Sequence, residues 1–211
     1  HFPPRPLRFD LSSSIFTDGS VRAFPYPPPS EGSQLVGAAA LHHPSTDTDT
    51  AFLLTQSPPL ILPFEMLALL MAVASPPPPN SASPHIFTDT LTTLFLLIRG
   101  LHGPAAPTFR FNRYHNLLTS IIHIATVSLS SHHTPIHIHK VRAHSSIHPH
   151  DRADAAARRA AAVVHGLGQD PVPPASLLPP WIHPTPISLD SLPGPYRLAA
   201  PPPPPPPPPH P

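Results

Sequence analysis

The sequence predicts a mostly disordered, low-complexity, proline-rich chain in which a single isolated α-helix is the best-defined element. Two observations predict this fold class. Proline makes up 39 of the 211 residues, against a usual share of about 5%. Because Pro lacks a backbone N–H, it fits neither the interior of a helix nor a central strand. The Pro residues also break the chain into short runs, and the longest run without Pro spans residues 108–134.

The composition is apolar rather than strongly charged. Hydrophobic residues account for 40% of the chain, charged residues for 11%, and the formal net charge is +1. A disordered chain is usually rich in charge, so this composition predicts a loose, aggregation-prone collapse. A net charge this small gives no field that would attract nucleic acid or an acidic membrane surface. Neither is an expected partner.

The density of proline divides the chain into three segments, and no globular domain is expected in any of them. Residues 1–84 form a Pro-rich low-complexity segment, and residues 85–170 form a His-rich segment with the fewest Pro interruptions. Residues 171–211 form a tail that contains nine consecutive Pro near its end. We expect polyproline II in this tail, because that extended helix suits repeated Pro and needs no core.

The elements expected before the helix are short and marginal. Apolar stretches near residues 64–74 and 91–98 are compatible with either helix or strand. Residues 117–129 contain no charge and no Pro and are rich in β-branched side chains, which predicts a strand, although the apolar spacing also suits a helix face. The stretch 64–74 is too short to span a membrane.

Residues 151–165 predict the one clear helix. The segment is rich in Ala, the strongest helix former, and it follows Pro149. Asp151 and Asp154 stand in the first turn, where a carboxylate interacts favourably with the helix dipole. Gly166 is placed to end the helix. A helix of this length would be only marginally stable without a packing partner.

Histidine offers candidate metal ligands. In an extended segment His137 and His139 would point to the same side and form half of a site for zinc, nickel or copper. His132 and His133 are candidate additions to this site. The chain has no Cys to complete a shell, and the spacing matches no structural zinc pattern. Any binding is therefore expected to be weak, and no cofactor is expected.

The proline segments predict a partner of another kind. Pro3, Pro6 and Arg8 fit the P-x-x-P-x-[KR] pattern of an SH3 ligand, in which polyproline II presents two ridges to an aromatic groove. Residues 75–79, with the sequence SPPPP, resemble the repeat unit of extensins, the hydroxyproline-rich plant wall proteins. Modules that recognise polyproline are the expected class of partner.

No catalytic signature is apparent. The sequence contains no G-x-S-x-G elbow, and paired carboxylates are nearly absent because Glu31 and Glu65 are the only Glu residues. The tetrapeptide Ile-Phe-Thr-Asp occurs at 15–18 and again at 86–89. Its flanking residues do not match, so it predicts no repeat architecture. We therefore expect no enzyme activity.

Residue usage suggests that the chain has no assignable function. Lys and Glu, whose codons begin with two purines, are almost absent, whereas Pro, Leu, Phe and Ser, most of whose codons begin with two pyrimidines, are abundant. This pattern is typical of a conceptual translation of non-coding or out-of-frame DNA. Two alternatives stay open: a disordered Pro-rich interaction or cell-wall-type protein that presents polyproline II ligands, and a weak His-dependent binder of divalent metals.

Overall fold

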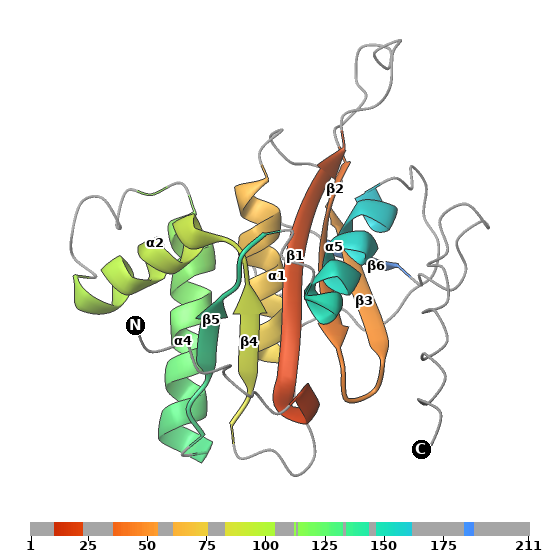
Figure 1. The fold of residues 1–211 in the computed structure, drawn as a ribbon. Helices are drawn as coiled ribbons and strands as arrows, with labels where there is room; N and C mark the ends of the chain where they lie inside the picture. Colours follow the sequence, from red (N-terminus) through yellow and green to blue (C-terminus); the bar gives the residue numbers. More distant parts are fainter. Residues whose placement is uncertain are drawn as a thin grey trace, which may run out of the picture.

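A mixed six-stranded β-sheet forms the centre of the structure, which is a computed structural model (Figure 1). The structure describes residues 11–22, 36–54, 61–75, 83–103, 112, 114–132, 134–143, 147–161 and 184–187. The strands are β1 (Ser14–Arg22), β2 (Val36–His43), β3 (Thr48–Leu54), β4 (His85–Thr88), β5 (His137–Lys140) and β6 (Pro184–Ile187). The expectation of a mostly disordered chain is wrong, because these strands and the helices that cover them form a folded domain.

The order of the strands in the sheet is β5-β4-β1-β2-β3-β6. The first three strands form an antiparallel meander, in which β1 pairs with β2 and β2 with β3. On the other side of β1, β4 pairs parallel with β1 and β5 pairs parallel with β4. The strand β6 adds to β3 at the opposite edge in the antiparallel direction.

Helices cover both faces of this sheet. They are α1 (Leu62–Ala74), α2 (Leu91–His102), α4 (His115–His132) and α5 (His148–Ala161), and a short 3-10 turn, η1 (Leu11–Ser13), precedes β1. Residues of α1, α2 and α4 share the main core with Ile15 and Ile86 on one face. On the other face Ala153 of α5 packs with Phe16 and Phe87 (Figure 1). The sheet is therefore the middle layer of three.

Proline is compatible with this fold because of where it stands in the described elements. Pro63 and Pro149 lie in the first turns of α1 and α5, where a helix makes no use of the missing N–H. Pro84 and Pro135 precede β4 and β5. The strand β6 contains two Pro residues and lies at the edge of the sheet, where a strand tolerates Pro. A count of Pro residues ignores these positions.

The stretch near 64–74, expected to be marginal, is the most deeply buried helix described. All residues of α1 from Pro63 to Val73 are buried. A helix that is apolar around its whole circumference belongs in the interior of a protein. Among these residues Glu65 is the one with an ionisable side chain, and it lies in the first turn.

The segment 117–129 was expected to be a strand, and that prediction is wrong. It lies within α4, where Leu117, Leu118 and Ile121 share one buried face. The hydroxyl of Thr126 donates a hydrogen bond of 2.8 Å to the carbonyl of Ile122 within the helix. Burial of this face against α1 outweighs the β-branched composition. The undecided stretch near 91–98 is also helical and belongs to α2.

The predicted helix 151–165 corresponds to α5, which begins earlier, at His148, and is described as far as Ala161. It is not isolated, because its Ala side chains pack onto β1, β2 and β3. Within the expected polyproline II tail, residues 184–187 form β6 instead, and the rest of 171–211 lies outside the described residues. In the described part of the chain no helix is both long and apolar enough to cross a bilayer.

Candidate active site

The two copies of Ile-Phe-Thr-Asp lie side by side in the sheet. In the parallel pair of β1 and β4, Ile15 is opposite Ile86 and Phe16 is opposite Phe87. The two Phe rings stack with their centroids 4.7 Å apart. Parallel strands in register bring equivalent positions to the same level. The two Asp residues that end the tetrapeptides, Asp18 and Asp89, are therefore brought close together.

A third carboxylate comes from the first turn of α1, and a glycine permits its approach. A Cβ atom on Gly19 would lie only 2.6 Å from the backbone nitrogen of Glu65 and 2.8 Å from the carbonyl carbon of Phe64. On the next strand, a Cβ on Gly37 would lie 2.0 Å from Cζ of the Phe64 ring. The absence of these side chains lets α1 lie directly on β1 and β2, and it brings Glu65 next to Asp18.

Asp18, Glu65 and Asp89 together form an acidic cluster. Each contributes a carboxylate oxygen, and these oxygens all lie within 4.8 Å of one another. Asp18 is 6% exposed and Glu65 is 7% exposed. The backbone N–H of Gly19 donates a 2.7 Å hydrogen bond to Oδ1 of Asp18, whereas the buried Oε2 of Glu65 has no hydrogen-bond partner among the described residues.

The electrostatics of this acidic cluster favour a bound cation. Burial, together with the negative charges of Asp89 and Asp154, raises the pKa of Asp18 to about 7. Burial and the negative charges of Asp18 and Asp89 together raise the pKa of Glu65 to about 9. Like charges this close and this buried cannot all be ionised unless a cation compensates them.

The helix α5 places two more ionisable groups beside the acidic cluster. His150 is buried, and its Nε2 lies 3.7 Å from Oδ2 of Asp89. The interaction with His150 lowers the pKa of Asp89 below its ordinary range. Asp154 follows one turn later on α5 and pairs with Arg158, and its charge acts on Asp18. The site therefore has acidic groups on β1, α1, α5 and the end of β4.

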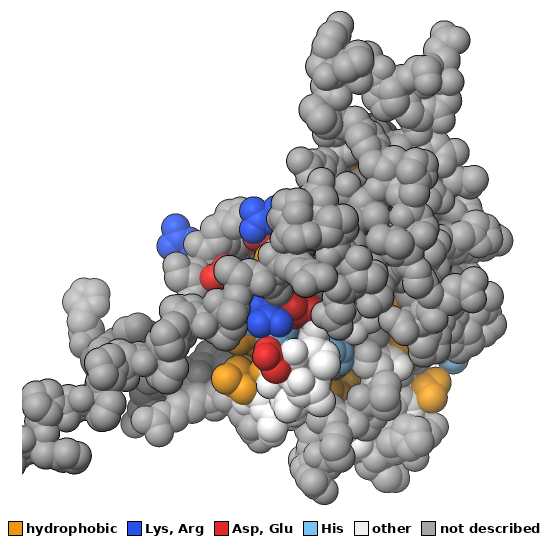
Figure 2. Space-filling view, turned by 90° about the vertical axis from the view of Figure 1, so that its right-hand side faces the viewer, with side chains coloured by type: hydrophobic (Ala, Val, Ile, Leu, Met, Phe, Trp, Pro, Cys, Tyr) orange, Lys and Arg blue, Asp and Glu red, His pale blue; other side chains and the backbone are white. Residues whose placement is uncertain are grey.

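Ion pairs to the largely enclosed carboxylate of Asp49 hold α5 in this position. Asp49 on β3 accepts hydrogen bonds from Nη2 and Nε of Arg152 at 2.8 and 3.2 Å. Oδ1 of Asp49 lies 2.7 Å from Nδ1 of His42. Nη2 of Arg159 lies 3.7 Å from Oδ2 of Asp49. Figure 2, which views the side of the molecule on the right in Figure 1, shows acidic and basic side chains next to each other on this face. This network joins α5 to the β2–β3 hairpin.

The acidic cluster fits a divalent cation with a preference for oxygen ligands. All three side chains are carboxylates, which suit Mg²⁺ or Mn²⁺. The Oε2 atom of Glu65 is buried without a hydrogen-bond partner in the described structure, as expected of an oxygen that is placed to bind an ion. Asp18, Glu65 and Asp89 are the residues that would hold it.

The residues expected from the sequence to bind metal or partners lie elsewhere. His137 and His139 stand on β5, where the structure adds His85 of β4 to them. His132 ends α4, and its side chain is not described. Outside the described residues lie His133, Pro3, Pro6 and Arg8.

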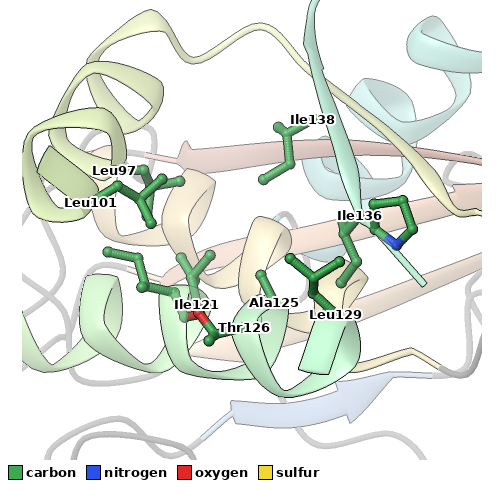
Figure 3. A pocket seen from close by; sticks show the side chains of 10 residues that line it. Leu97, Leu101, Ile121, Ala125, Thr126, Leu129, Ile136 and Ile138 are labelled. Atoms are coloured by element: carbon green, nitrogen blue, oxygen red, sulfur yellow. The ribbon is translucent and has the colours of Figure 1, made fainter. Parts of the chain in front are cut away.

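An apolar pocket of about 220 Å³ lies between α2, α4 and β5 (Figure 3). Leu97 and Leu101 contribute from α2, and Ile136 and Ile138 line the side of β5. Among the residues that line the pocket, Thr126 has the only polar side chain. The pocket therefore contains no group for acid–base or metal chemistry, and it is separate from the acidic cluster.

Sequence reasoning missed the acidic cluster although a signal was present. The tetrapeptide Ile-Phe-Thr-Asp occurs twice although its flanking residues differ, and Glu65 is one of only two Glu residues in the sequence. The predictions of no catalytic arrangement, no enzyme activity and no assignable function are wrong. The structure contains a folded domain with an acidic triad, two of whose members are buried, that is compatible with an active site.

Neither a protein-family model nor a curated protein matches the sequence. Solved structures do resemble the fold. A foamy viral protease-reverse transcriptase in complex with dsDNA is 15% identical, with a TM-score of 0.50, and the match covers 74% of this chain and 100% of that chain. The PFV RNase H domain is 17% identical, with a TM-score of 0.49, and the match covers 71% and 94% of the two chains. A type 1 RNase H with the type 2 active-site motif is 13% identical, with a TM-score of 0.41, and the match covers 70% and 71%. At these identities the likeness concerns the fold, which is RNase H-like on the strength of the first of these structures.

Proposed function

We propose that this chain is a divalent-metal-dependent nuclease that hydrolyses phosphodiester bonds in the manner of a ribonuclease H. The observation that carries the proposal is the acidic cluster of Asp18, Glu65 and Asp89, with oxygens within 4.8 Å of one another. The RNase H-like fold supports it. Fold alone does not define a function, so the chemistry of the cluster is the main argument.

The side chains of the site have different proposed roles, which follow from their positions. Asp18 and Glu65 are the buried ligands, and Asp89 approaches them from the end of β4. A bound divalent ion supplies positive charge that stabilises the transition state at phosphorus and makes water a better nucleophile. His150 acts on Asp89 as a positioning residue, because its Nε2 lies 3.7 Å from Oδ2 of that carboxylate. Asp154 adds a carboxylate beside Asp18.

The proposed reaction is a hydrolysis. The oxygen of water forms a bond to phosphorus while the bond from phosphorus to the leaving sugar oxygen breaks, and that oxygen gains a proton. The products are a phosphate monoester and a free hydroxyl group. In-line displacement of this kind is chiefly a matter of positioning and charge stabilisation, which a rigid group of carboxylates on a sheet and two helices can provide.

Nucleic acid as a substrate departs from the expectation based on net charge. The net charge of +1 describes the whole chain, whereas a phosphate is recognised locally. Cations held by the acidic cluster would be the largest local charges and would reverse the sign of the site. Within the proposal, the RNA strand of an RNA–DNA hybrid is the first substrate to test, since the similar structures include RNase H domains by name.

The test compares the purified wild-type chain with Asp18→Asn, Glu65→Gln and Asp89→Asn. Labelled RNA–DNA hybrid, single-stranded RNA and double-stranded DNA are incubated with Mg²⁺, with Mn²⁺ and with a chelator. We expect metal-dependent cleavage that falls by on the order of 100-fold in each variant. Asp151→Asn, which changes an exposed carboxylate of α5, is the matched control and should cleave normally.

The variants also control for contaminating nucleases, because they are prepared in the same way as the wild type. Failure to cleave any of the three substrates with either metal would overturn the proposal. Cleavage that persists in Asp18→Asn and Glu65→Gln would do so as well.

A further inference from the structure

A second group of ligand-type side chains lies on β4 and β5, away from the acidic cluster. In the parallel pairing of these strands His85 is opposite His137, and Phe87 is opposite His139. Residues two apart on a strand point to the same face. Two imidazoles of β5 and one from a much earlier position in the sequence therefore gather on one face near the edge of the sheet.

The distances between these imidazoles are short. Nδ1 of His85 and Nε2 of His139 lie 2.9 Å apart. The ring of His137 lies 4.9 Å from that of His85, centroid to centroid, and 6.3 Å from that of His139. One proton lies between these two ring nitrogens. Once that proton is lost, both nitrogens carry a lone pair and can bind a metal ion.

We infer that His85 and His139 bind a zinc ion or a similar borderline divalent cation, with His137 as a third ligand. Imidazole nitrogen suits zinc, copper and nickel, whereas the carboxylates of the acidic cluster suit magnesium and manganese. With zinc–nitrogen bonds of about 2.0–2.1 Å at tetrahedral angles, two ligand nitrogens stand roughly 3.4 Å apart. The observed pair at 2.9 Å needs only a modest opening of the rings to reach this geometry.

The ring of His139 is partly buried and lies against that of His85, with the two ring centroids 5.1 Å apart. His139 is also fixed from the other side, because its ring stacks on Phe87 at a centroid distance of 4.9 Å. His137 is exposed and can turn its ring toward an ion at small cost.

This histidine site is independent of the acidic cluster. His85 begins β4, whereas Asp89 follows the end of that strand. Four residues of extended chain correspond to about 13 Å, too far for one ion to contact both groups. The sequence predicted a half-site at His137 and His139, and the fold supplies the missing partner from a position 54 residues away from His139.

The experiment measures Zn²⁺ affinity of the full chain by competition with a chromophoric chelator. We expect His85→Gln and His139→Gln each to weaken the tightest site by about tenfold or more, and His137→Gln to weaken it less. His123→Gln, an exposed imidazole of α4, is the matched control and should bind Zn²⁺ like the wild type. Asp18→Asn should also leave this Zn²⁺ affinity unchanged.

Wild-type Zn²⁺ affinity in His85→Gln and His139→Gln would overturn the inference, as would an equal loss in His123→Gln. Because His137 is exposed, His137→Gln should fold normally, and it keeps the test valid if a partly buried variant unfolds. In the wild type, histidine ¹⁵N NMR should show Zn²⁺-dependent shifts at Nδ1 of His85 and Nε2 of His139. Their absence at saturating Zn²⁺ would also contradict the inference.

Discussion

Ile15 on β1 and Ile86 on β4 are cross-strand partners in a parallel pair. Each begins the same tetrapeptide, so the carboxylates of Asp18 and Asp89, three residues further along, reach the same place. The short repeat does not indicate a repeat architecture, but its two Asp residues both belong to the acidic cluster.

The stability of the metal-free protein should fall as pH rises from about 4 to 9. In the folded protein the pKa of Asp18 is about 7, against an ordinary 3.8, and that of Glu65 is about 9, against 4.5. A raised pKa means that the folded state binds more protons, so the stabilisation is complete at low pH and is lost as pH rises through these values. Thermal unfolding in the presence of a chelator measures this dependence.

Added Mg²⁺ should reduce this loss, because an ion replaces the protons that hold the carboxylates together. The double variant Asp18→Asn, Glu65→Gln should show a shallower pH dependence and little response to Mg²⁺. A melting temperature of the wild type that rises steadily from pH 5 to 9 in chelator would contradict this account.

Asp49→Ala should destabilise the fold by about 3 kcal/mol, because it removes the carboxylate that pairs with His42, Arg152 and Arg159. Asp49 is 7% exposed and accepts hydrogen bonds from Arg152. Asp47→Ala is the matched control, since Asp47 pairs with the same Arg152 at 3.4 Å but is 74% exposed, and it should cost less than about 1 kcal/mol. Chemical denaturation measures both, and equal effects would contradict the assigned role of the network.

Gly19→Ala should impair metal binding at the acidic cluster more than Gly37→Ala does. The new Cβ of Gly19→Ala would lie 2.6 Å from the backbone nitrogen of Glu65, so α1 itself must shift. In Gly37→Ala the clash is with the side chain of Phe64, which chiefly affects packing. Mn²⁺ titration of the two variants measures the difference, and identical Mn²⁺ affinities would show that Gly19 has no special role in placing Glu65.

Leu118→Ala should destabilise the protein by about 3 kcal/mol, the usual cost of a cavity in a core. Leu118 lies on the buried face of α4 and is fully buried. Val127→Ala, on the same helix at 40% exposure, should cost less than about 1 kcal/mol. Equal effects in denaturant titrations would argue against a helix that packs by one face in this segment.

Several features of the fold could be predicted locally, and others could not. The helix around residues 151–161 was visible because Ala content and an acidic first turn act within a few residues of each other. The helical state of 117–129 was not visible, because β-branched side chains favour a strand until Leu117 and Leu118 are buried against α1. The number of Pro residues alone predicts too little regular structure, because the effect of a Pro depends on whether it stands at the start of an element or inside it.

By itself, the sequence determined the helical propensity of α5, the apolar character of α1 and the chemical identity of the ligands. Histidines on β5 were recognised as candidate ligands, and an Asp stands at the end of each tetrapeptide. Only the tertiary structure decided which of these groups meet. Asp18, Glu65 and Asp89 come from a strand, a helix and a strand end that are separated in the chain. Their proximity depends on strand register and on the close approach at Gly19, which are products of packing between distant segments.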